Sequence, residues 1–457
     1  MQGAFDKLAE IRPTLAKGPE TVLHEDEFLQ KADLVPVRRQ AAEHRRRAVL
    51  AELAEIIRQR QWQQALDLFY PVEEKIPELS DLGMDTAVRE KLAFALGQLG
   101  RFDDAITQLK VCVATEPDNF YPHSALAYTA YNSLFAARNR ELFLRGKLRD
   151  ERIVLAHRHF EQAQRLRPEG VTNFYRQGML KHKIEGKPKK ALPLFERAIK
   201  NWEVLDDADR ERRHQEHKNY VKALYQKSGI LLSLGNCGEA SGALKRCLEE
   251  DEQSGHLSRL HKYFALGKIE YHANSLEAAK NALLFAEKCS GRAPNDFVFE
   301  LLARVYLALD DSGKALAAIE RIPEKQRRPY VHWTEADALC DLGHYDRAKS
   351  VLEACNQRDR LSRHKGLLRL CRIEYLMGNY RQVIGYAQEA DRFYRERWAN
   401  PCADALFWLA VGALRVGDLS QARKVAQELA SFQPGYPKLN RLLVLTGAEG
   451  ADHEPET

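Results

Sequence analysis

Few residue patterns in this 457-residue sequence have the spacing that catalysis or metal binding requires. His214 and His217 could present two imidazoles on one helix face, but they lie in a heavily charged run with no cysteine nearby. Gly313-Lys314 is followed by Ala315 and lacks the upstream glycine of a phosphate-binding loop. The G-x-S-x-G and H-E-x-x-H patterns are absent, as is a glycine-rich dinucleotide turn. We therefore expect no enzymatic activity, no metal and no cofactor.

The eight cysteines do not form a C-x-x-C pair anywhere in the chain. Cys112, Cys247 and Cys355 instead recur at equivalent positions of expected helices. Free cysteine is among the most frequently buried residue types, because it behaves as a small apolar side chain. We expect reduced thiols in the core rather than disulfides.

The composition is that of a soluble protein, with 44% hydrophobic and 30% charged residues. No segment approaches the run of about 18 apolar residues that would span a membrane. The first residues include Asp6 and Glu10 and lack the apolar core of a signal peptide, so we expect a cytoplasmic protein. The formal net charge of +5 is mild for this length and neither requires nor excludes nucleic acid.

The most regular stretch of the sequence is Thr86–Asn119. Apolar residues recur at helical spacing on both sides of Gly100, among them Leu92 before the glycine and Leu109 after it. This pattern predicts two short antiparallel helices joined by a glycine turn. So small a unit cannot bury its own apolar faces, and it must therefore stack on copies of itself.

About ten such units follow one another between residues 46 and 436, each marked by a small residue in its second helix. Successive markers are 33 to 40 residues apart, except where insertions near 136–152 and 206–218 widen the spacing to 51 and 49. The first insertion is rich in arginine, and we expect it to lengthen both helices or to form a projecting loop. The sequence therefore predicts an all-α solenoid.

This pattern resembles the tetratricopeptide repeat, whose signature is an aromatic residue, Leu-Gly or Leu-Ala, Tyr, then Ala, Phe, Ala and a closing Pro. The matches in residues 86–119 are Leu92, Ala93, Gly100, Ala105 and Pro117. The matches in residues 172–205 are Tyr175, Gly186, Ala191, Phe195 and Ala198. The resemblance implies a right-handed superhelix of helix-turn-helix repeats. It also implies that the first helices of the repeats line a concave surface where ligands bind.

Segments outside the repeats are expected at both ends. Residues 1–45 are basic and interrupted by prolines, and we interpret them as a helical extension that caps the array, with a docking arm for an acidic partner as the alternative. Residues 46–436 form the repeat array. Residues 437–450 carry apolar residues on one helical face, as a terminal cap requires. Residues 451–457 are acidic, and we expect them to be disordered.

Aromatic and basic residues recur at the first-helix positions expected to face the concave surface. They are Tyr128, Tyr131, Arg176, Lys183, Lys222, Tyr225, Lys268, Tyr271, Arg304, Trp333, Lys365, Arg369, Arg372 and Trp408. Basic groups would hold carboxylates, and rings would supply contact area at low entropic cost. About half of the aromatic residues are expected to be core, and Asp337 and Asp341 could pair with Arg304 or Arg372.

We therefore expect a scaffold or adaptor whose groove binds an extended peptide or protein segment with acidic and apolar side chains. A second hypothesis is a solenoid that binds RNA or single-stranded nucleic acid through the same residues and the arginine-rich runs. A third is a non-catalytic subunit that positions an enzyme encoded elsewhere. Lys365 and Arg369 match the last pair of a chaperone carboxylate clamp, but the preceding clamp positions do not match, which argues against that subfamily.

Overall fold

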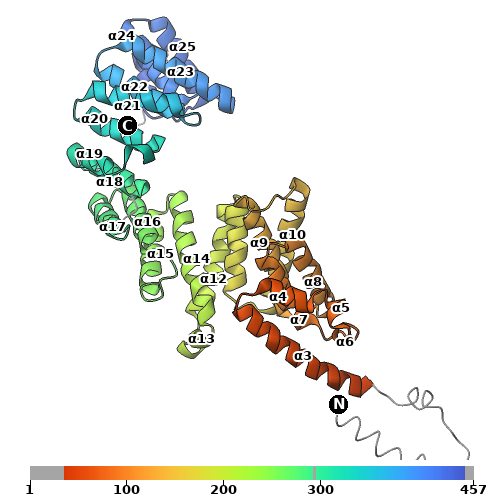
Figure 1. Ribbon diagram of the computed structural model, residues 1–457. Coiled ribbons are helices and arrows are strands. Elements are labelled where there is room, and N and C mark those ends of the chain that lie inside the picture. Colours follow the sequence, from red (N-terminus) through yellow and green to blue (C-terminus); the bar gives the residue numbers. More distant parts are fainter. Residues whose placement is uncertain (1–34, 292–294, 448–457) are drawn as a thin grey trace, which may run out of the picture. The chain divides into compact units, whose positions relative to one another are not determined.

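The protein is described by a computed structural model that covers residues 35–291 and 295–447 (Figure 1). Every regular element of these residues is a helix, and β-strands are absent from them. The all-α prediction is thus confirmed. The chain divides into two compact units, Met1–Ile230 (the N-terminal unit) and Leu231–Thr457 (the C-terminal unit), which we describe separately.

The N-terminal unit is a succession of helix pairs. Its helices are α3 (Val35–Arg58), α4 (Trp62–Phe69), α5 (Val72–Lys75), α6 (Pro77–Ser80), α7 (Thr86–Gln98), α8 (Phe102–Thr115), α9 (Phe120–Arg138), α10 (Gly146–Leu166), α11 (Thr172–Met179), the π-helix η1 (Leu180–Ile184), α12 (Pro188–Glu203), α13 (Asp207–Arg212) and α14 (His214–Ser233), which continues into the C-terminal unit. α7 packs against α8, α9 against α10, and α11 against α12.

The unit predicted at residues 86–119 is the pair α7 and α8. Gly100 ends the first helix with a φ of 75°, a left-handed conformation that glycine adopts without steric cost. Leu92 and Ala105 are completely buried, and Leu109 is nearly so. The helix–turn–helix prediction is confirmed, and the residues expected to form its framework do form its core.

The first insertion lengthens both helices of its pair and also adds a loop. α9 and α10 have 19 and 21 residues, compared with 13 and 14 in α7 and α8. Residues 139–145 connect the two long helices. The second insertion, near residues 206–218, becomes the short helix α13 and the first turn of α14.

The predicted boundary at residue 45 lies inside α3, which continues without interruption from the basic segment into the first repeat. Two arginines at this boundary are engaged by carboxylates within the protein. Arg45 Nε lies 3.2 Å from Glu78 Oε1, and Arg46 Nε lies 2.7 Å from Glu43 Oε2. Residues 1–34 of the predicted extension and the acidic tail 451–457 lie outside the described residues.

The C-terminal unit continues the same architecture. Its helices are α15 (Cys237–Glu250), α16 (Arg259–His272), α17 (Leu276–Lys288), α18 (Asp296–Ala308), α19 (Ser312–Glu320), the 3₁₀-helix η2 (Glu324–Gln326), α20 (Pro329–Asp341), α21 (Tyr345–Arg358), α22 (Arg363–Leu376), α23 (Tyr380–Trp398), α24 (Ala403–Val416), α25 (Leu419–Phe432) and α26 (Leu439–Thr446). α26 lies within the predicted capping segment and packs against α25, with Leu439 and Leu442 buried.

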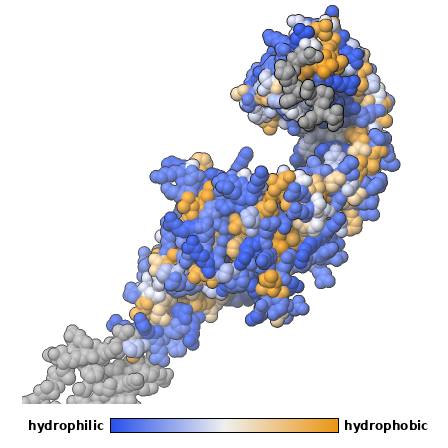
Figure 2. Space-filling view, turned by 180° about the vertical axis from the view of Figure 1, so that it is seen from behind, coloured by the Kyte–Doolittle hydropathy of each residue, from blue (hydrophilic) through white to orange (hydrophobic). Residues whose placement is uncertain are grey.

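The apolar residues are buried mainly between helices. The face shown in Figure 2 is mostly hydrophilic, with hydrophobic residues in small patches. None of the helices described is both long enough and apolar enough to cross a membrane. All eight cysteines are free thiols, as predicted, and Cys112 and Cys247 are completely buried.

Small residues lie where the two helices of a pair approach most closely. A methyl group added to Gly267 of α16 would lie 2.6 Å from Leu283 Cγ of α17. One added to Gly178 of α11 would lie 2.8 Å from the ring of Phe195 in α12. These distances are below van der Waals contact, so any larger residue would force the paired helices apart.

We predict that Gly267→Ala destabilises the protein by about 1–3 kcal/mol, because the buried Leu283 cannot move away from the new methyl group. Gly242→Ala is the matched control, since Gly242 lies in α15 with no atom near its missing Cβ. It should stabilise by up to about 1 kcal/mol through the lower entropy of the unfolded chain. Urea unfolding of both variants checks this. Equal free energies of unfolding for the two variants would contradict the close approach of α16 and α17 at Gly267.

Candidate functional site

Three first helices lie side by side in the N-terminal unit. Ser124 Oγ of α9 donates a hydrogen bond to Asn173 Oδ1 of α11 over 3.1 Å. Asn219 Nδ2 of α14 donates to Thr172 Oγ1 of α11 over 2.9 Å. These bonds fix the register of α9, α11 and α14, so that side chains one helical turn further along each helix lie at a similar level. Those side chains include three of the predicted site residues, namely Tyr128, Arg176 and Lys222.

Arg176 is the central residue of this group. Its guanidinium carbon lies 3.7 Å from the centre of the Tyr128 ring, which is close enough for a cation–π interaction. Burial lowers the pKa of Arg176, although the neighbouring Tyr128 and Tyr131 act in the opposite direction. Arg176 forms no ion pair with a carboxylate of residues 35–291 or 295–447. It is therefore a partly buried cation with an aromatic neighbour and no counter-ion.

Lys183 and Lys222 have the same character. Burial and the positive charge of Arg138 lower the pKa of Lys183. Burial and the positive charge of Lys218 lower the pKa of Lys222. Neither ammonium group pairs with an acidic side chain in the part of the chain that the structure describes. We call Arg176, Lys183 and Lys222 the basic face; each would be stabilised in its charged form by a bound anion.

A pocket of 310 Å³ lies beside Lys183, at one end of the basic face. It is lined by Leu134, Ala137, Arg138, Leu142, Phe143, Leu144, Arg149, Lys183 and Ile184. The charged lining residues are all basic, and Phe143 on the connecting loop is 85% exposed. Lys183 belongs to the π-helical turn η1, a type of irregularity that occurs often at functional sites.

Phe143 and Arg138 line this pocket but were not among the residues predicted from the sequence. Both belong to the first insertion, which has no counterpart in the repeat pattern from which site positions were predicted. The signal that could have found them is an aromatic residue within an arginine-rich insertion. Such a residue has few apolar neighbours within its own segment and marks a surface that can bind a partner.

The tyrosines of the N-terminal unit differ in their environment. Tyr131 packs against Phe135 and Phe160, with ring centroids 4.5 and 6.3 Å apart, and burial raises its pKa to about 12. It belongs chiefly to the core. Tyr128 and Tyr225 are partly buried as well. Tyr128 stacks on Tyr131 with ring centroids 6.2 Å apart and carries the Arg176 guanidinium over its ring.

Several predicted cations of the C-terminal unit are already neutralised. Arg372 binds Asp341 at 2.9 Å, as the sequence suggested. Asp337 was expected to pair with Arg304 or Arg372, which is wrong: it binds Arg369 at 3.0 Å, because that arginine lies opposite it on the next first helix, α22. Arg304 lies 4.0 Å from Glu300 and 5.0 Å from the centre of the Tyr271 ring. These arginines stabilise the stacking of neighbouring helices.

Among the remaining predicted residues of the C-terminal unit, Trp333 and Lys365 form one cluster with the Arg369–Asp337 pair. Lys365 and Arg369 both lie over the Trp333 ring, at 5.4 and 5.5 Å from its centre. Trp408 packs against the Tyr375 ring at 5.7 Å. Lys268 is exposed. The predicted stripe therefore separates into unpaired cations in the N-terminal unit and mostly engaged side chains in the C-terminal unit.

No protein-family model matches the sequence, and no curated protein matches it either. Among solved structures, a tetratricopeptide repeat protein from Parabacteroides merdae is 16% identical, with a TM-score of 0.39 over 60% of this chain and 92% of that one. Yeast Tom70 is 12% identical, with a TM-score of 0.38 over 89% and 96%. Structural similarities with TM-scores and sequence identities this low carry no inference about function. The helix pairs themselves confirm the all-α array of helix-turn-helix units expected from the sequence.

We predict that the ammonium groups of Lys183 and Lys222 titrate at lower pH than that of Lys314, whose pKa is raised by its hydrogen bond to Asp311. Arg138→Gln should raise the pKa of Lys183, because it removes a nearby positive charge. Reductive methylation with ¹³C-formaldehyde followed by NMR titration measures these values, with each signal assigned by a Lys→Arg variant. Coincident titration of the three lysines would contradict the unpaired, partly buried basic face.

Proposed function

We propose that this chain is a non-enzymatic scaffold protein whose basic face binds a segment of a partner protein with acidic and apolar side chains. The supporting observation is that Arg176, Lys183 and Lys222 are partly buried without a counter-ion in the described residues. Burying cations without partners costs free energy, and natural proteins rarely retain such groups unless a ligand satisfies them. The basic face is therefore best understood as half of an interface.

Acidic side chains are the partners that this chemistry favours. A carboxylate that accepts hydrogen bonds from a partly desolvated arginine or lysine forms a charge-assisted bond, which is roughly twice as strong as a neutral one. The adjacent rings of Tyr128 and Tyr225 offer apolar surface for the side chains between the acidic residues. Phe143 and Leu144 do the same at the pocket beside Lys183.

A protein partner is favoured over nucleic acid by the state of the arginine-rich runs. In the first insertion, Arg149 Nη2 donates to the backbone oxygen of Ile184 over 2.9 Å, and Arg152 is bound to Asp103. In α3, Arg45 and Arg46 are bound to glutamates. Cations engaged in this way are less available to phosphates, which weakens the case for phosphate binding along these runs.

We expect Arg176→Glu combined with Lys222→Glu to abolish partner binding, since both changes reverse charges that would face the ligand. The charge-matched control is Lys268→Glu with Lys365→Glu, which changes two exposed predicted residues of the C-terminal unit. Quantitative affinity purification from the native host compares the two variants with the unchanged chain. Peptide arrays that tile the recovered proteins then locate the bound segments.

The expected result is loss of partners by about tenfold or more with the first variant and retention with the control. Bound array peptides should be rich in Asp and Glu beside apolar residues. Unchanged partners in the Arg176 and Lys222 variant, or equal losses in both variants, would refute the proposed site. Tight binding of mixed oligonucleotides that weakens steeply with salt would instead support the nucleic-acid hypothesis.

A further inference from the structure

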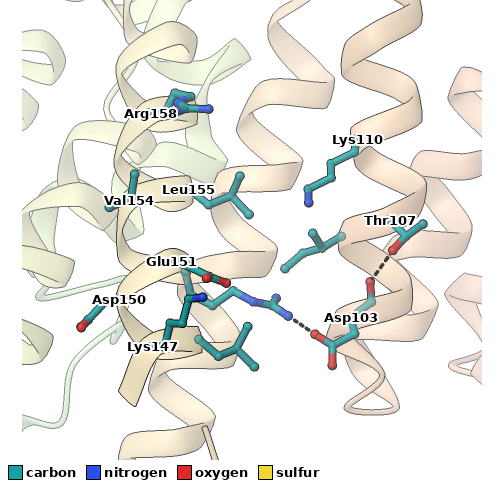
Figure 3. A pocket seen from close by; sticks show the side chains of 12 residues that line it. Asp103, Thr107, Lys110, Lys147, Asp150, Glu151, Val154, Leu155 and Arg158 are labelled. Atoms are coloured by element: carbon teal, nitrogen blue, oxygen red, sulfur yellow. Dashed lines mark hydrogen bonds and ion pairs between the residues drawn. The ribbon is translucent and has the colours of Figure 1, made fainter. Parts of the chain in front are cut away.

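A second surface feature of the N-terminal unit lies between α8 and α10, the second helices of adjacent pairs (Figure 3). Both helices pack against α9, and the space between them is a cleft of 960 Å³. The cleft involves no residue of the basic face. It is therefore independent of the function proposed above.

The cleft has apolar surface that is only partly covered, and this surface comes from α10. Leu148 and Leu155 of α10 line the cleft and are partly buried, and Val154 also lines it and is 58% exposed. On the opposite side Ile106 of α8 is only 5% exposed and already belongs to the core. One face of α10 thus offers apolar side chains in an open cleft, against which the apolar face of a third helix can pack.

One polar residue that lines this cleft, Arg152, has a buried hydrogen-bond donor that lacks an acceptor. It is only 5% exposed, and its Nη2 donates across the cleft to Asp103 of α8. Its Nη1 is buried, and no atom of the described residues accepts a hydrogen bond from it. The Asp103 side chain is 80% exposed and so can share the guanidinium with an incoming group. A carboxylate oxygen is the acceptor that a guanidinium in this state lacks.

The charges around Arg152 favour an acidic group as well. In Figure 3 Lys110 and Lys147 extend toward the cleft, whereas Asp150 points away from it. Glu151 interacts electrostatically with Arg152 and, with Asp103, is an acidic side chain that an incoming carboxylate would meet. Among the residues that line the cleft, the four basic side chains (Lys110, Lys147, Arg152 and Arg158) outnumber the three acidic ones (Asp103, Asp150 and Glu151).

We propose that the cleft between α8 and α10 binds an amphipathic helix of a partner protein, with one Asp or Glu side chain of that helix bound by Arg152. Its apolar residues pack against Leu148 and Leu155 of α10. A helix satisfies its own backbone hydrogen bonds, whereas an extended segment would bury unpaired backbone groups against this apolar lining. Packing between two helices also matches the ridges and grooves by which helices associate.

The test uses a displayed library of amphipathic helices of about 15 residues, a length at which isolated helices begin to form. The full-length protein is the bait, and binders that still bind the Val154→Arg variant are removed. Val154 is exposed, so this change blocks the cleft without disturbing the core. Selected peptides should share one Asp or Glu within an apolar stripe. Failure to select any Val154-sensitive binder, or selection of basic or uncharged stripes, would overturn the proposal.

The role of Arg152 is tested with a double-mutant cycle on one selected peptide. Arg152→Gln in the protein and Glu→Gln in the peptide should each weaken binding about tenfold, and the two changes together should cost little more than one alone. The peptide change leaves the protein untouched, so its effect cannot arise from misfolding. The Arg176→Glu, Lys222→Glu variant should bind the peptide normally. Additive effects, or unchanged affinity with Arg152→Gln, would show that Arg152 does not bind the carboxylate.

Discussion

The structure depends on the inability of one short helix pair to bury its own apolar residues. Each pair presents apolar side chains to its partner helix and to the next pair, so completely buried residues such as Leu92, Phe195 and Leu283 form a core that runs along each unit. The same constraint brings the paired helices close together. At Gly178 and Gly267 the facing helix leaves no room for a side chain. Exposed faces contribute little to this core, which leaves them free to carry ligand-binding residues.

The two units use their exposed charges differently. In the C-terminal unit, Arg369 and Arg372 of α22 reach acidic residues of α20, so the charges join neighbouring first helices. In the N-terminal unit the corresponding face carries cations that the described residues leave unpaired, and burial and like charges lower the pKa of Lys183 and Lys222. The same residue types at the same repeat position therefore serve stacking in one unit and remain available to a ligand in the other.

Periodicity made the fold predictable from the sequence. Apolar residues such as Leu109 must recur at helical spacing so that one face of the helix can be buried. The first-helix register was also predictable, and it brought Tyr128 and Arg176 into contact. Ion pairing was harder, since whether Asp337 binds Arg304, Arg372 or, as found, Arg369 depends on how far adjacent helices are displaced. Residues of the first insertion could not be placed, because Arg152 and Phe143 have no equivalent in other repeats.

Helix α10 contributes to both cavities of the N-terminal unit. Its Arg149 lines the pocket beside Lys183 and binds the backbone of η1, while Arg152, one turn further along, spans the cleft toward α8. The two cavities have different lining residues, yet the first turns of one helix support both. A ligand that displaced these turns in one cavity would alter the other as well, and by thermodynamic linkage such an effect on affinity would be reciprocal.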